Sequence, residues 1–209
     1  MNTEKQISAF LLQCGAVKLQ PEHPFTWASG WKSPIYCDNR ITLSFPEVRT
    51  FIRDSFANLI KREFGTPDII AGVATGAIAQ GALVADKMGI AMAYVRSAPK
   101  GHGMENLIEG KIEKEQKVVV IEDLISTGGS SLKAVEALRN HGCEVLGMCA
   151  IFSYNFPAAQ QAFAEANVKL FTLSNYNTLI EQAIESGYVK TEQLELLKKW
   201  REAPDKWGI

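Results

Sequence analysis

The sequence predicts an α/β fold with a mostly parallel central sheet, helices on both faces and a small N-terminal attachment. Short runs of apolar and β-branched residues alternate along the chain with stretches whose apolar residues recur every three or four positions. This pattern breaks between residues 20 and 45, where three prolines and two tryptophans occur with no steady period. We expect one domain, 1–209, to which residues 1–45 contribute the attachment.

Each expected strand is a short apolar run. The run 118–121 consists of three valines and one isoleucine, which suits a parallel strand that is buried on both faces. The other expected strands are 68–72, 91–95, 144–152 and 168–173.

The expected helices follow from apolar spacing and from residues that begin or end a helix. Pro46 can start a helix whose apolar residues recur three or four apart as far as Gly65. Asn175 can cap a later helix through its side chain. In chain order the expected helices are 7–12, 46–64, 75–85, 132–141, 158–166, 178–185 and 191–200.

Charge and composition exclude several classes of function. Lys and Arg number 22 and Asp and Glu 23, so no overall field attracts nucleic acid or an anionic membrane. The four cysteines form no C-x-x-C motif, and the chain has only three histidines. The sequence therefore argues against a metal site built from Cys and His ligands. No run approaches the roughly 18 apolar residues of a membrane span, and the N-terminus does not resemble a signal peptide. We expect a cytoplasmic protein with unpaired thiols.

The stretch 117–132 carries the strongest chemical signal. We expect its strand to end at the acids Glu122 and Asp123, and the small donor-rich residues 126–130 follow. Carboxylates suit vicinal hydroxyls or a hydrated metal, whereas hydroxyls and glycine N–H groups suit a phosphate. Ser130 or Ser131 is expected to cap the next helix and place its positive end beneath the anion. A ribose 5-phosphate has both parts, although an ordinary strand–turn–helix unit remains the alternative.

A second informative stretch is the loop 96–110. Arg96, Lys100 and His102 lie among glycines and a proline, with no apolar period to hold the stretch on a core. We expect a mobile cationic loop, which could neutralise a leaving group with several negative charges and exclude water. A simply solvated loop is the alternative. The loop 73–77 is expected beside residues 117–132, where its N–H groups could bind a pyrophosphate.

Three motifs resemble those of a known family. The run V-V-V-I-E-D-L-I-S-T-G-G-S resembles the phosphoribosyl-pyrophosphate (PRPP) signature of type I phosphoribosyltransferases. The segment F-T-W-A-S-G-W-K-S-P-I-Y-C-D-N-R and the pattern R-x-x-x-K-x-H-G are similar to the N-terminal motif and the catalytic loop of orotate phosphoribosyltransferases. The resemblance implies the type I phosphoribosyltransferase fold, a base-covering hood formed by residues 1–45, and transfer of ribose 5-phosphate from PRPP to orotate in UMP biosynthesis.

The resemblance also implies roles for individual residues. Catalysis would involve Lys100, His102 and Asp123, and orotate would meet Ser126, Tyr36 and Cys37. The PRPP site would comprise Arg96, Lys100, His102, Glu122, Asp123, Leu124, Ile125, Ser126, Thr127, Gly128, Gly129 and Ser130.

Further expectations concern cofactor and partners. Mg²⁺ would arrive bound mainly through PRPP, with no protein metal cage. The resemblance implies a homodimer in which the loop 96–110 reaches the neighbouring subunit's site, with no nucleic-acid or membrane partner. Ala28 and Ser97 stand where some family members have lysine, and Lys32 is interpreted as a solvated turn lysine. The alternatives are another base as acceptor, or a PRPP-sensing regulator on the same fold.

Overall fold

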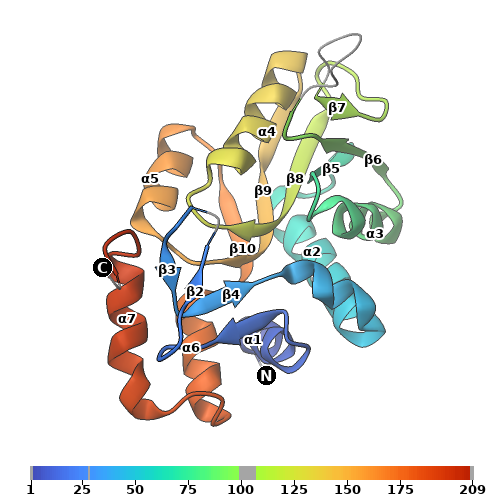
Figure 1. The fold of residues 1–209 in the computed structure, drawn as a ribbon. Coiled ribbons are helices and arrows are strands. Elements are labelled where there is room, and N and C mark those ends of the chain that lie inside the picture. The colour runs from blue at the N-terminus through green and yellow to red at the C-terminus, as the bar shows by residue number, and fades with distance from the viewer. Residues whose placement is uncertain (1, 28, 99–106, 208–209) are drawn as a thin grey trace.

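A computed structural model describes residues 2–27, 29–98 and 107–207. Its central sheet has the strand order β10 (Leu170–Asn175), β9 (Glu144–Ser153), β8 (Lys117–Ile125), β5 (Ile69–Val73), β6 (Ala91–Val95) and β7 (Ile108–Glu109). Neighbouring strands are parallel except for the β6–β7 pair. The expected parallel α/β sheet is therefore confirmed, and β7 is an addition to it (Figure 1).

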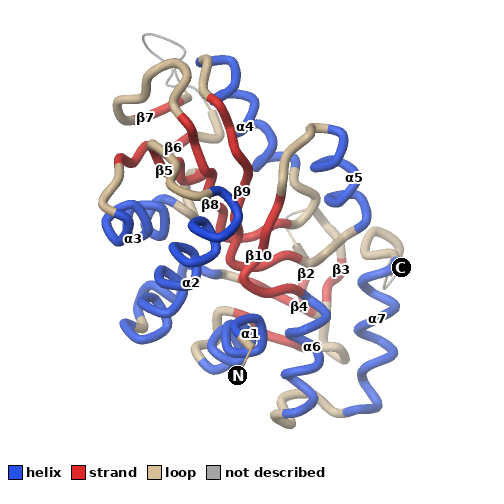
Figure 2. The backbone as a smooth tube through the Cα atoms, turned by 180° about the vertical axis from the view of Figure 1, so that it is seen from behind, coloured by secondary structure: helices blue, strands red, loops and turns tan. Residues whose placement is uncertain are grey.

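Helices cover both faces of this sheet, as expected. On one face lie α1 (Thr3–Gln13), α2 (Pro46–Phe64), α3 (Ile78–Met88) and α6 (Tyr176–Glu185), and several of these cross in front of the strands in Figure 2. On the other face lie α4 (Gly129–His141) and α5 (Pro157–Glu165). Alternate side chains of β8 pack into the hydrophobic cores on the two faces of the sheet. Val119 and Ile121 pack against the face that carries α1, α2, α3 and α6, and Val118 and Val120 against the face that carries α4 and α5. Burial on both faces explains why β8 is apolar throughout.

Short antiparallel strands form the N-terminal attachment, which we call the hood. Strand β1 (Val17–Leu19) pairs with β4 (Ile35–Cys37), and β2 (Phe25–Thr26) pairs with β3 (Lys32–Ser33). The 3₁₀ helix η1 (Asn39–Ser44) leads from the hood to α2. Near the C-terminus, η2 (Thr191–Gln193) precedes α7 (Leu194–Glu202), whose fully buried Trp200 packs edge-on against Trp27 of the hood at 5.7 Å between ring centroids.

Two local expectations around β8 are wrong. The strand does not end at the acid pair but runs on to Ile125, because its pairing with β9 continues to that residue. The helix that follows is not capped by Ser130 or Ser131. Gly128, with φ of 85°, occupies the N-cap position without a side-chain cap, and Ser131 lies inside the helix, in its first turn. A left-handed backbone at this point favours glycine over any capping serine.

None of the helices in the described part of the chain is long and apolar enough to cross a membrane.

Candidate active site

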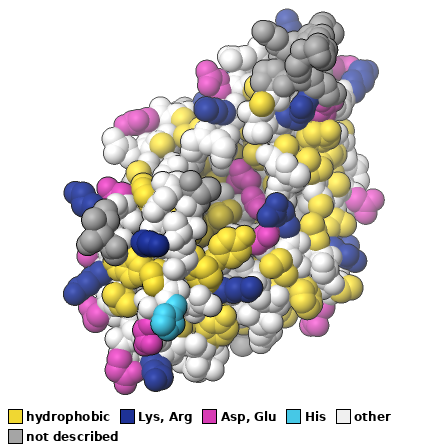
Figure 3. All heavy atoms as spheres, viewed as in Figure 1, with side chains coloured by type: hydrophobic (Ala, Val, Ile, Leu, Met, Phe, Trp, Pro, Cys, Tyr) yellow, Lys and Arg dark blue, Asp and Glu magenta, His cyan; other side chains and the backbone are white. Residues whose placement is uncertain are grey.

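The site forms at the carboxyl ends of β5 and β8, where open α/β sheets commonly bind ligands. Gly76, in the turn that follows β5, lies directly against the Asp123 carboxylate, so that a Cβ built on Gly76 would overlap that group. The structure thus brings the loop 73–77 and the stretch 117–132 together, as the sequence predicted. Acidic and basic side chains lie close together around a hollow near the middle of this face (Figure 3).

The two neighbouring acids have different surroundings. Glu122 is 5% exposed, and its carboxyl group accepts hydrogen bonds from Ser131 Oγ at 2.8 Å and from the Asp123 N–H at 2.9 Å. Burial, together with the neighbouring Asp123 carboxylate, raises the pKa of Glu122 to about 8. Glu122 therefore joins β8 to the first turn of α4, whereas Asp123 is partly exposed beside Gly76.

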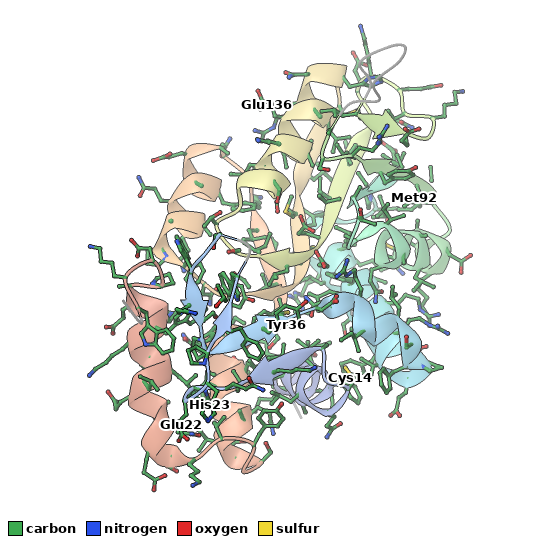
Figure 4. All side chains as sticks on the ribbon, in the orientation of Figure 1. Cys14, Glu22, His23, Tyr36, Met92 and Glu136 are labelled. Atoms are coloured by element: carbon green, nitrogen blue, oxygen red, sulfur yellow. The ribbon has the colours of Figure 1, made fainter. Side chains whose placement is uncertain are left out.

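A cavity of about 270 Å³ lies between the hood and the end of β8. It brings together the three residues predicted to meet orotate, namely Tyr36 and Cys37 from β4 and Ser126 from the loop after β8. Tyr36 is labelled on β4 in Figure 4. Among the described residues, the lining consists of Thr26, Trp27, Tyr36, Cys37, Leu124, Ser126 and Tyr154. We call this cavity the base pocket.

Sequence reasoning missed three residues of the pocket: Thr26 and two aromatic residues, Trp27 and Tyr154. Their rings are tilted by 32° with centroids 5.3 Å apart, and Trp27 Nε1 donates to the Ile35 carbonyl at 3.1 Å. Trp27 lies inside the N-terminal motif quoted above, which could have suggested it. Tyr154 follows β9 and reaches the pocket because its N–H donates to the Ile125 carbonyl of β8 at 3.1 Å, a contact without a sequence signal. The two rings give the pocket a rigid aromatic wall suited to a flat ligand.

Asn39 joins the hood to the strand that carries Asp123. Its side chain is 1% exposed, and Nδ2 donates to the Asp123 carbonyl at 2.6 Å. Asn39 Oδ1 accepts from the Cys37 thiol at 3.4 Å. Burial, and then the negative charge of Asp123, hold the pKa of Cys37 well above its usual value, so this thiol is neutral at physiological pH.

A larger cavity, of about 600 Å³, lies along α4, from Gly129 to Asn140. Arg96, which forms an ion pair with Glu109 at 3.5 Å, lines it together with Ser130 of the predicted phosphate loop. Glu136 of α4 lies on its wall as well (Figure 4). Arg96 and the phosphate loop thus border one space. Lys100 and His102 lie outside the described residues.

The predicted phosphate loop follows β8 directly. Thr127 and Gly128 lie between the end of β8 and the start of α4 at Gly129, so the N–H groups of the first helical turn are close by. Leu124 and Ile125 lie at the end of β8; Ile125 is buried in the core, and Leu124 lines the base pocket. Among the described residues, no three His, Cys, Asp or Glu side chains cluster as metal ligands.

Comparison with known proteins agrees with this geometry. Residues 43–183 match the family described as phosphoribosyl transferase domain. The chain is 60% identical over 205 residues to an orotate phosphoribosyltransferase of Porphyromonas gingivalis, covering 98% of each chain. It is 56% identical over 208 residues to one of Listeria monocytogenes, covering 100% of each.

Among solved structures, orotate phosphoribosyltransferase from Aeropyrum pernix superposes with a TM-score of 0.77 at 27% identity, covering 88% of this chain and 99% of that one. The fold is thus the type I phosphoribosyltransferase fold. The hood lies outside the general family match but inside the alignments with these relatives. By sequence over nearly its full length, this chain belongs to the orotate phosphoribosyltransferase family.

Proposed function

We propose that this chain transfers the ribose 5-phosphate of PRPP to orotate, giving orotidine 5′-monophosphate and pyrophosphate in UMP biosynthesis. One observation carries the proposal: the base pocket, which includes Tyr36, Cys37 and Ser126, lies directly beside Asp123 and the phosphate loop. A base, a ribose and a 5-phosphate can therefore occupy adjacent sites.

The reaction breaks the bond between ribose C1 and a pyrophosphate oxygen, which keeps the electron pair, and forms a bond from C1 to the orotate ring nitrogen, which gives up its proton. Positive charge develops on the ribose as the bond breaks, so an anion near the ring favours the transition state. We assign Asp123 to this role and to binding the ribose hydroxyls. The loop 126–130 would hold the 5-phosphate, and the pocket walls would aim the base nitrogen at C1.

The leaving pyrophosphate needs cations. Arg96 borders the larger cavity, and we assign Lys100 and His102 of the same loop to the pyrophosphate as well, with either able to donate a proton to it. Glu122 is assigned to the ribose site together with Asp123. Because both Glu122 oxygens accept internal hydrogen bonds, it would serve chiefly by holding β8 and α4 in place.

Magnesium is proposed as the cofactor. Asp123 is a partly exposed acid beside the proposed ribose site, and its carboxylate would suit a hydrated Mg²⁺ held mainly by PRPP oxygens. When bound, Mg²⁺ would neutralise charge on the pyrophosphate.

We further propose a cytoplasmic homodimer built from single-domain subunits, in which the loop 96–110 serves the neighbouring subunit's site. All four cysteines are free, which suits a reducing compartment.

The test is loss of orotate's ultraviolet absorbance with purified protein, PRPP and Mg²⁺, omitting each component in turn. Turnover that needs all three, and that falls at least ~100-fold in Lys100→Ala, or about 2.7 kcal/mol of transition-state stabilisation, would support both the reaction and the loop assignment. PRPP-dependent thermal stabilisation without orotate consumption would instead indicate a protein that binds PRPP and lacks this activity.

A further inference from the structure

Orotate differs from uracil by a carboxylate, and the base pocket supplies no positive charge for it from its own walls. The seven lining residues in the described part of the chain have aromatic, aliphatic, hydroxyl or thiol side chains. Burial raises the pKa of both Cys37 and Tyr154 in the lining, and the negative charge of Asp123 adds to both rises. An anionic ligand entering here would be disfavoured unless a cation lies at the rim.

Lys32 is a cation in that position. It lies on β3 directly opposite Thr26 of β2, so the two side chains share one face of the hairpin. Lys32 Nζ donates to Thr26 Oγ1 at 2.7 Å, and Thr26 lines the base pocket. Lys32 forms no ion pair with any acid in the described part of the chain. An ammonium group has three donors, so two remain after the bond to Thr26.

Two other cations of the hood are less suited. Arg40 is held by two hydrogen bonds to the Asp38 carboxylate, at 2.7 and 2.9 Å, which neutralise it. Lys18 lies opposite Tyr36 in the β1–β4 pair, but it does not line the pocket, and its ammonium group donates no hydrogen bond to a lining residue in the described part of the chain.

We propose that Lys32 binds the carboxylate of orotate and thereby gives the pocket its preference for orotate over uracil. This inference rests on the proposed function. Thr26 holds the ammonium at the rim, so the ion is positioned before the ligand arrives. Lys32, interpreted from the sequence as a solvated turn residue, becomes a residue that determines substrate specificity.

The test compares Lys32→Met and Lys32→Arg with Lys18→Met, a matched control on the same hood. Met keeps an unbranched apolar stem but no charge, and Arg keeps the charge. We expect Lys32→Met to raise the KM for orotate about 10–100-fold, as for loss of a charge-assisted hydrogen bond, with the KM for PRPP changed less than about twofold. The preference for orotate over uracil in kcat/KM should fall by a similar factor. Lys32→Arg should recover most of both, and Lys18→Met should match wild type.

The outcomes separate the two proposals. If the wild type does not consume orotate, the proposed function fails and the Lys32 inference fails with it. If the wild type is active and Lys32→Met keeps its KM for orotate within about twofold, the inference alone is overturned. An equal rise in both KM values would assign Lys32 a structural role and overturn it too, as would an effect in Lys18→Met instead. Thermal unfolding of each variant shows whether it remains folded.

Discussion

Replacing Asn39 by alanine should weaken both stability and turnover, because its amide joins the hood to β8 at the acid proposed to meet the ribose. The hydrogen bond from Asn39 Nδ2 to the Asp123 carbonyl is 2.6 Å long and links residues 84 positions apart. Leaving that carbonyl without its donor costs about 1–3 kcal/mol. In a domain of this size each kcal/mol lowers the unfolding midpoint by about 2–4 °C, so we expect a decrease of about 2–12 °C.

Activity should fall by more than the stability loss explains, since small displacements of an acid from its productive geometry can reduce rates about 100-fold. Thermal unfolding and steady-state kinetics on Asn39→Ala would measure the two effects at a temperature where the variant is fully folded. Asn39→Asp keeps the size but loses the amide donor and should behave similarly. Asn58→Ala, on the exposed side of α2, is the control and should change the midpoint little. Midpoints within 1 °C of wild type and unchanged kcat/KM in both Asn39 variants would refute the reasoning.

Three further predictions follow from the site. The pKa of Glu122 is about 8 in the folded protein and 4.5 in the unfolded chain, so between these pH values the folded protein holds a proton that the unfolded chain has lost. The free energy of unfolding should therefore fall as the pH rises from about 5 to 8, by up to about 1.4 kcal/mol per pH unit from this group, and denaturant unfolding should show that Glu122→Gln removes this slope. If wild type and variant have parallel pH profiles, the buried-acid assignment is wrong. Gly76→Ala should displace the Asp123 carboxylate and reduce kcat/KM about 100-fold with little loss of stability, because the overlapping group is the end of a movable side chain; kinetics like those of wild type would contradict this contact. A chelator should stop orotate consumption and added Mg²⁺ should restore it, whereas turnover that persists in excess chelator would argue against the proposed cofactor.

Local pattern predicted the elements whose signal lies in consecutive residues. The run 118–121 is apolar because β8 is buried on both faces, and Asn175 caps α6 by accepting from the N–H groups of Asn177 and Thr178, as expected. The loop 73–77 was expected beside the acid pair because both follow parallel strands, and the contact of Gly76 with Asp123 confirms it. These features depend on residue type and on strand direction.

Other features could not be predicted because they depend on neighbours that are distant in the chain. Strand β7 has two residues and exists through its pairing with β6. The continuation of β8 past Asp123 depends on β9, and the same pairing brings Tyr154 to the base pocket. Capping propensity favoured a serine, but the left-handed turn at Gly128 moved Ser131 into the helix.

The sequence by itself determined the order of strands and helices, the composition of the phosphate loop and the family, because these depend on residue type and spacing along the chain. Only the tertiary structure decided which side chains form one site. In the tertiary structure Ser131 donates a hydrogen bond to the buried Glu122, and Asn39 donates one to the Asp123 carbonyl. Lys32 donates one to Thr26 at the rim of the base pocket. The physical reason is that a buried polar group needs a hydrogen-bond partner. The packing of the hood against the sheet determines which groups become partners.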